Sequence, residues 1–143
     1  MKRLFLSNLA TVKNQGLNKY ERLKSRKQID ILFKSKQGVF AHPVRYAWGK
    51  GREDQLAPVE MMVSVSKRNF KRAVDRNRIK RLMREVYRKN KQVLYEFLQD
   101  KDLKISLALV FVAKVMPDYK SIEKSVLKAM KRIIEEIEQN GVR

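Results

Sequence analysis

AVDRNRIKRLMRE, at residues 73–85, is the most informative segment of the sequence. Set at about 100° per residue, it predicts an amphipathic helix from Lys71 or Ala73 to Phe97 or Leu98. One face is apolar and is expected to be buried: Ile79, Leu82, Met83, Val86, Val93 and Phe97. The opposite face is mostly cationic: Asn77, Lys80, Arg81, Arg84, Arg88 and Lys91, with Arg78 and Lys89 on one flank. The helix is therefore expected to bury one side and to offer the other to an anionic partner.

The segments on either side of this helix predict an α+β fold. A short helix is expected between Ser25, whose spacing to Gln28 suits a capping box, and Gly38. Alternating strands are predicted at 43–48 and 61–65, and the nearly continuous apolar run at 105–112 indicates a strand covered on both faces. A last helix is expected at 121–139. The prediction is a single-domain α-β-β-α-β-α sandwich with a small central sheet over residues 19–140, preceded by a loose N-terminal extension at 1–18.

The composition indicates a folded body that meets a polyanion. The 143 residues carry a formal net charge of +19, and 43% of them are hydrophobic, too many for a disordered basic tail. Nucleic acid is the partner class that this charge favours, because binding it releases counterions. A membrane surface is the rival, although no apolar run approaches the about 18 residues needed for a span. The absence of cysteine excludes disulfides and thiolate catalysis and fits the cytoplasm, where we expect the protein.

No catalytic or metal-binding residue is predicted for the polypeptide. His42 is the only histidine, and a general base or a metal site needs convergent partners. The acidic residues are spread over different predicted elements. The basic helix could also be an ordinary solvated face, but such faces mix charges, whereas Lys80/Arg84 and Arg84/Arg88 place like charges at i,i+4. Phe33, Tyr46 and Trp48 are candidates for stacking on bases, and core packing is the commoner role of each.

The ordered set Ser66-Lys67-Arg68 followed by residues 73–85 resembles the signature of the bacterial ribonuclease P protein family. The resemblance extends over roughly residues 20–138. It implies binding to the catalytic RNA of ribonuclease P and assistance in removing the 5′ leader of precursor tRNA, with hydrolysis by the RNA and its Mg²⁺, so that the protein holds no cofactor. It also implies a left-handed crossover around the long helix, against the usual preference.

The resemblance further implies two sets of contact residues. The catalytic RNA would meet Lys67, Arg68, Arg72, Arg76, Asn77, Arg78, Lys80, Arg81, Arg84 and Arg88. A cleft between the first helix and one sheet face would receive the leader, with Ile29, Phe33, Tyr46 and Trp48 as its candidate residues. Where many relatives have a glycine, this chain has Phe70-Lys71-Arg72 and one extra residue. The alternatives are a ribosomal or other structural RNA-binding protein without a catalytic partner, and a helix-turn-helix DNA binder. The helix-turn-helix alternative is disfavoured because strands, and not short helices, flank the basic helix, so no DNA partner is expected.

Overall fold

A four-stranded sheet forms the middle of the molecule. The computed structural model describes residues 17–34 and 40–141. The strands are β1 (Phe40–Ala41), β2 (Val44–Lys50), β3 (Val59–Val65) and β4 (Ile105–Phe111), in the spatial order β1-β2-β4-β3. β4 pairs antiparallel with β2 and parallel with β3, so the sheet is mixed. The helices are the short 3₁₀ helix η1 (Lys19–Glu21), α2 (Arg26–Lys34), α3 (Ala73–Asp100) and α4 (Tyr119–Asn140).

The predicted α+β class and the predicted order of the main helices and strands are confirmed. Gln28 N–H donates to Ser25 Oγ at 3.3 Å at the start of α2, while Gly38 and residues 1–16 lie outside the described part of the chain. β1 and η1 are additions that the sequence pattern missed. Contacts with the folded part begin before the predicted boundary at residue 19, because Leu17 packs against the core and Asn18 caps η1. Asn18 Oδ1 accepts from Tyr20 N–H at 2.8 Å.

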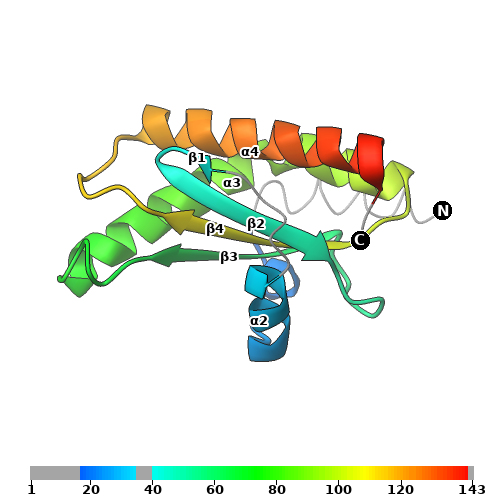
Figure 1. Cartoon of the computed structure of the whole chain (residues 1–143), viewed down its shortest axis with the longest axis horizontal. Helices are drawn as coiled ribbons and strands as arrows, with labels where there is room; N and C mark the ends of the chain where they lie inside the picture. Colours follow the sequence, from blue (N-terminus) through cyan, green and yellow to red (C-terminus); the bar gives the residue numbers. More distant parts are fainter. Residues whose placement is uncertain (1–16, 35–39, 142–143) are drawn as a thin grey trace.

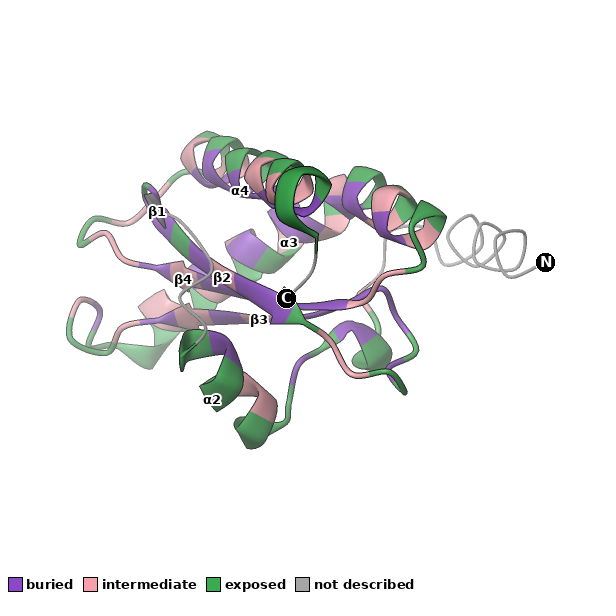
Figure 2. Cartoon of the chain, turned by 45° about the vertical axis from the view of Figure 1, so that its right-hand side comes forward, coloured by how far each residue is buried: buried purple, intermediate pink, exposed green. Residues whose placement is uncertain are grey.

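The two faces of the sheet are covered very differently. α3 and α4 lie on one face, and α2 projects from the other (Figure 1). β4 is buried along nearly its whole length, as its apolar run predicts. Figure 2 shows that the buried residues concentrate between the sheet and the two long helices. The main hydrophobic core therefore lies on the α3/α4 face, and α2 packs over a smaller cluster formed by Leu23, Leu32 and Ala108 with Ile29, Ala47 and Met62.

The buried stripe of α3 differs from the prediction in its C-terminal half. Val93 is 67% exposed, whereas Lys91, predicted on the polar face, is only 7% exposed. The residues buried on α3 are Ile79, Met83, Val86, Tyr87, Lys91, Leu94 and Leu98, while Leu82 and Phe97 are partly buried. A single helix direction fails here because α3 contacts both β3 and α4, and its C-terminal half also reaches η1. The buried direction consequently rotates along the helix.

Candidate RNA interface

The predicted RNA-contact residues gather on α3 and on the turn that precedes it. Lys67, Arg68, Arg72, Asn77, Arg78, Arg81 and Arg84 are exposed, and Arg76, Lys80 and Arg88 are partly exposed. Among the described residues, Arg78, Lys80, Arg81 and Arg84 have no carboxylate within ion-pair distance. The structure thus presents a row of unneutralised cations along one side of a rigid helix, which suits contact with successive phosphates.

Arg76 differs from its neighbours because its guanidinium already has partners in the protein. Its Nη1 donates to the carbonyl oxygens of Phe70 at 2.7 Å and of Lys71 at 2.8 Å. Phe70 is buried and its ring centroid lies 5.9 Å from that of Phe111. Arg76 therefore holds the turn at 66–72 against the start of α3, and this turn carries three of the predicted contact residues.

Glu85 is the acidic residue that interrupts the cationic row. It accepts from Arg88, with 3.2 Å between Arg88 Nε and Glu85 Oε2, and Lys89 Nζ lies 3.6 Å from Oε1. The hydrogen bond from Arg88 lowers the pKa of Glu85, and the same bond raises the pKa of Arg88. Glu85 consequently relieves part of the repulsion between neighbouring cations and fixes the direction of Arg88.

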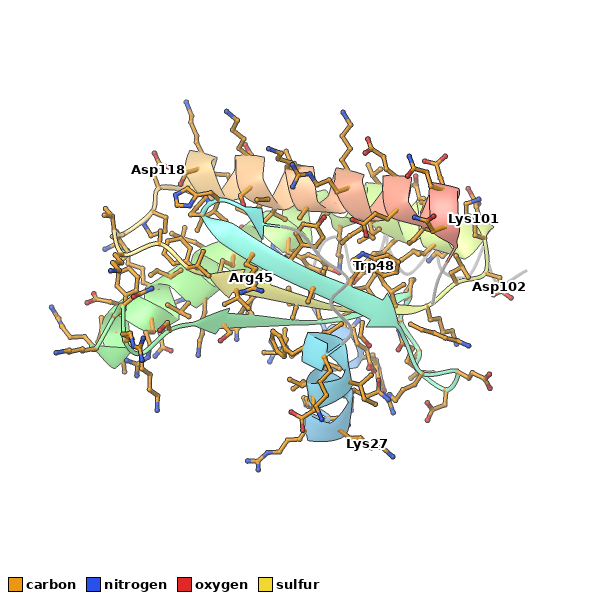
Figure 3. All side chains as sticks on the ribbon, in the orientation of Figure 1. Lys27, Arg45, Trp48, Lys101, Asp102 and Asp118 are labelled. Carbon is orange, nitrogen blue, oxygen red and sulfur yellow. The ribbon has the colours of Figure 1, made fainter. Side chains whose placement is uncertain are left out.

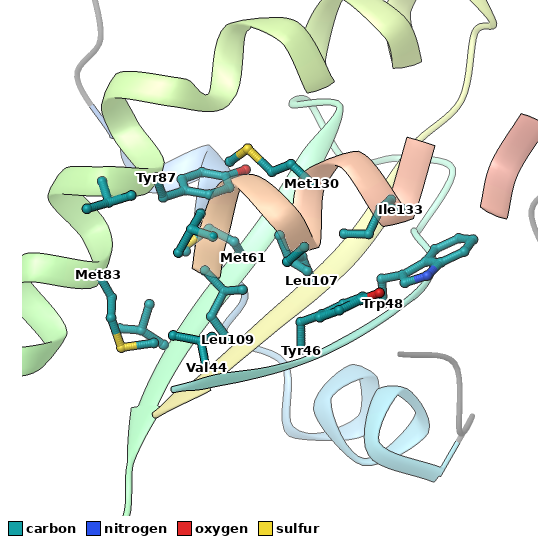
Figure 4. Packing of buried hydrophobic residues seen from close by; sticks show 14 of the residues in the cluster. Val44, Tyr46, Trp48, Met61, Met83, Tyr87, Leu107, Leu109, Met130 and Ile133 are labelled. Atoms are coloured by element: carbon teal, nitrogen blue, oxygen red, sulfur yellow. The ribbon is translucent and has the colours of Figure 1, made fainter. Parts of the chain in front are cut away.

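Tyr46 and Trp48 are not part of a leader cleft, and that part of the prediction is wrong. Their side chains are 2% and 1% exposed and point from β2 toward α4, away from α2 (Figure 4). Trp48 Nε1 donates to Glu136 Oε2 at 2.7 Å, and the Tyr46 hydroxyl donates to Glu136 Oε1 at 3.4 Å. Burial, followed by the charge of Glu136, raises the pKa of Tyr46 to about 12. Both aromatic residues belong to the core, with their polar ends satisfied by α4.

The other two predicted cleft residues do lie on the α2 side of the sheet. Phe33 is 48% exposed, whereas Ile29 is partly buried and packs with the small cluster under α2. Phe33 is thus available to a ligand, and Ile29 supports the helix.

Sequence reasoning missed the strand residues that share this face. Arg45 is paired in register with Val110, and Val110 with Ser64 of β3, so the three form a row across the sheet. Arg45 is exposed on β2, where Figure 3 marks it. Alternation along β2 was the signal that could have found it: once Tyr46 and Trp48 are assigned to the core, Arg45 must face the other side.

In the described ranges, no three His, Asp or Glu side chains come together in an arrangement that could hold a metal ion. Within the same residues, no helix combines the length and the apolarity that crossing a bilayer requires.

Comparison with known proteins gives a consistent result. The profile of the family described as Ribonuclease P matches residues 17–134. The ribonuclease P protein component of Porphyromonas gingivalis strain W83 is 39% identical over 118 residues, which is 82% of this chain and 86% of that protein. Among solved structures, the RNase P protein of Staphylococcus aureus superposes with a TM-score of 0.62 at 20% identity, covering 79% of this chain and 94% of that one. The RNase P protein from Thermotoga maritima gives 0.62 at 20% identity, over 78% and 96%.

Proposed function

The chain belongs to the ribonuclease P protein family, and from this membership we infer how its surface divides between two RNAs. As a member it is the protein subunit of a ribonucleoprotein endoribonuclease of tRNA maturation, with a catalytic RNA as its partner. We propose that the cationic side of α3, together with the turn at 66–72, binds this catalytic RNA. The 5′ leader of precursor tRNA is proposed to lie on the sheet face that carries α2, against Phe33 and the row that begins with Arg45.

The observation that carries this proposal is the set of α3 cations that no acidic side chain of the described residues neutralises: Arg78, Lys80, Arg81 and Arg84. Holding like charges together on a helix costs stability, and a phosphate backbone removes that cost when it binds. We further propose that the hydrolytic Mg²⁺ ions are bound by the RNA and that the particle acts in the cytoplasm on RNA rather than DNA. The cysteine-free sequence fits that compartment.

Reconstitution tests the function directly. Purified protein, catalytic RNA and leader-bearing precursor tRNA are combined at low Mg²⁺, and cleavage is compared with RNA alone and with protein alone. We expect cleavage from the mixture and none from the protein alone. Cleavage by the protein without RNA, or no stimulation of the RNA by the protein, would contradict the proposal.

The salt dependence of binding measures how many cations of α3 meet phosphates. If about six do, log K for the catalytic RNA falls against log salt with a slope of roughly −5. Arg81→Ala is expected to reduce the size of that slope by about one unit and to leave the melting temperature unchanged. Lys131→Ala, which removes an exposed cation on α4, is the matched control and should not change the slope. A slope near −1 for the unmodified protein would exclude a broad electrostatic interface.

Phe33→Ala tests the proposed leader contact on the α2 side of the sheet. We expect it to weaken binding of leader-bearing precursor more than binding of mature tRNA, by about 1–3 kcal/mol if one base stacks on the ring. Ile31→Ala is the control, because Ile31 is 51% exposed on the same helix but lies on a different side of it. Equal losses for both RNAs, together with a lower melting temperature, would show that Phe33 serves only the packing of α2.

A further inference from the structure

Arg22 and Arg84 meet at one pocket, although one precedes α2 and the other lies on α3. The pocket has a volume of about 260 Å³ and lies beside β3. Its cationic residues are Arg22, Lys24 and Arg84, and its apolar part includes Met61, Met62 and Val63. Among residues 17–34 and 40–141, no acidic side chain lines it. Three positive side chains thus surround a hollow that an anion could enter.

The two guanidinium groups are close enough to disturb each other. Burial, and then the charge of Arg22, lower the pKa of Arg84. Neither arginine has an ion-pair partner in the described part of the chain. Glu21, the acidic residue next to Arg22, is occupied on the other side: it accepts from Lys91 Nζ at 2.6 Å and from the Tyr95 hydroxyl at 2.7 Å. The folded chain therefore keeps two like charges together, while the carboxylate that precedes Arg22 in the sequence is paired with other residues.

The position of Arg22 is fixed by both of its neighbours. Glu21 is 3% exposed and ion-paired to α3, and Leu23 is 6% exposed. Leu23 N–H donates to Met61 O at 2.8 Å, and Arg22 forms a parallel bridge to Met61 at the free edge of β3. Arg22 itself is exposed between these two anchors. Buried contacts thus fix the backbone of Arg22 beside the pocket that Arg84 also lines.

We propose that Arg22 and Arg84 grip a single RNA phosphodiester between them, with Lys24 adding positive charge. A guanidinium presents a planar set of N–H donors that fits phosphate oxygens in pairs, so two of them can surround one phosphate. Binding would also remove the repulsion between them. This inference rests on the proposed function, since the phosphate would belong either to the catalytic RNA or to the leader of precursor tRNA.

A double-mutant cycle tests whether the two arginines share one phosphate. Arg22→Gln, Arg84→Gln and the double variant are compared for affinity and salt slope, with catalytic RNA alone and with leader-bearing precursor added. Each single change is expected to weaken binding roughly tenfold or more, as loss of a charged hydrogen-bonding group does. The double variant should be little weaker than either single one, with a slope reduced by about one unit in total. If affinity falls with catalytic RNA alone, the phosphate belongs to that RNA. If affinity falls only when precursor is added, the phosphate belongs to the leader.

A second double-mutant cycle, with Arg78→Gln and Arg84→Gln, is the matched control. These two cations are on the same helix but point in different directions, so they are not expected to share a phosphate. Here the losses should add. If the losses of Arg22→Gln and Arg84→Gln also add, with a slope change of about two, or if neither variant weakens binding, the shared site is wrong. If Arg78→Gln and Arg81→Ala leave catalytic-RNA binding intact as well, the proposed function of α3 itself fails.

Two controls keep folding apart from binding. Each glutamine variant removes repulsion, so its melting temperature at low salt should equal or exceed that of the unmodified protein. Arg22→Lys keeps the charge but not the guanidinium, so it should bind more weakly than the unmodified protein with an unchanged salt slope. A melting temperature lowered in both Arg22→Gln and Arg84→Gln would show that these residues stabilise the fold and would overturn the inference.

Discussion

Replacing Trp48 by alanine is expected to lower the free energy of unfolding by about 3–5 kcal/mol. The indole is 1% exposed within the core between β2 and α4, and its Nε1 donates to Glu136 Oε2 at 2.7 Å. Truncation therefore leaves a large cavity and removes a hydrogen bond from a carboxylate that is only partly exposed. Urea denaturation followed by circular dichroism measures the loss.

The same variant separates a core role from a role in RNA binding. Where Trp48→Ala remains folded, at low temperature, its affinities for leader-bearing precursor and for mature tRNA should fall equally or not at all. Trp48→Phe is the milder control, since it keeps most of the packing and loses only the donor to Glu136. A stable Trp48→Ala protein that discriminates less well between the two RNAs would restore the original stacking prediction.

Replacing Lys91 by methionine is the second change with a large expected effect. Lys91 Nζ lies 2.6 Å from Glu21 Oε1, and the two side chains are only 9% and 4% exposed. Removing one member of such a buried pair leaves an uncompensated charge in the interior and typically costs about 3–5 kcal/mol. The Tyr95 hydroxyl at 2.7 Å and the Asn18 N–H at 2.9 Å would still donate to Glu21, so the carboxylate would keep two hydrogen bonds but lose its cation.

Two variants make this test specific. Lys89→Met removes a cation two residues earlier on α3 whose side chain is 48% exposed, and it should change stability by no more than about 1 kcal/mol. Glu21→Leu combined with Lys91→Met removes both charges and should be more stable than Lys91→Met alone, because the unpaired carboxylate is gone. A cost below about 1 kcal/mol for Lys91→Met would show that water reaches Glu21 in the native state.

The first half of α3 shows why part of the fold could be predicted. Ile79, Met83 and Val86 follow the helical period and are fully buried, because a single surface covers them. The prediction is wrong for Lys91 and Val93, because α3 packs against β3, α4 and η1 at different points along its length. The side of the helix that is buried therefore changes along it. Periodicity describes a helix against one neighbour, and only the tertiary structure shows that η1 brings a carboxylate to Lys91.

The sequence predicts only part of the candidate RNA interface, and again the missing part depends on the tertiary structure. A run of cations on one helix face is visible in the sequence, and the structure keeps most of it exposed. The direction of an aromatic side chain on a strand is not visible in the residue itself, since Tyr46 and Trp48 suit a stacking surface and a core equally well. Arg22 could not be found from sequence at all, because its significance depends on a residue of α3 that folding brings beside it.

The small hydrophobic cluster under α2 has a consequence for local unfolding of the molecule. α2 spans nine residues and buries only Leu32, which packs in a small cluster with Leu23 and Ala108, whereas α3 and α4 enclose the large core. Helices this short are marginal without tertiary support, so α2 is expected to detach as a local unit at a free energy well below that of global unfolding. Its amide hydrogens should therefore exchange with solvent long before those of β4. RNA seated beside Phe33 would slow that exchange selectively, and ordering α2 would then form part of the cost of binding.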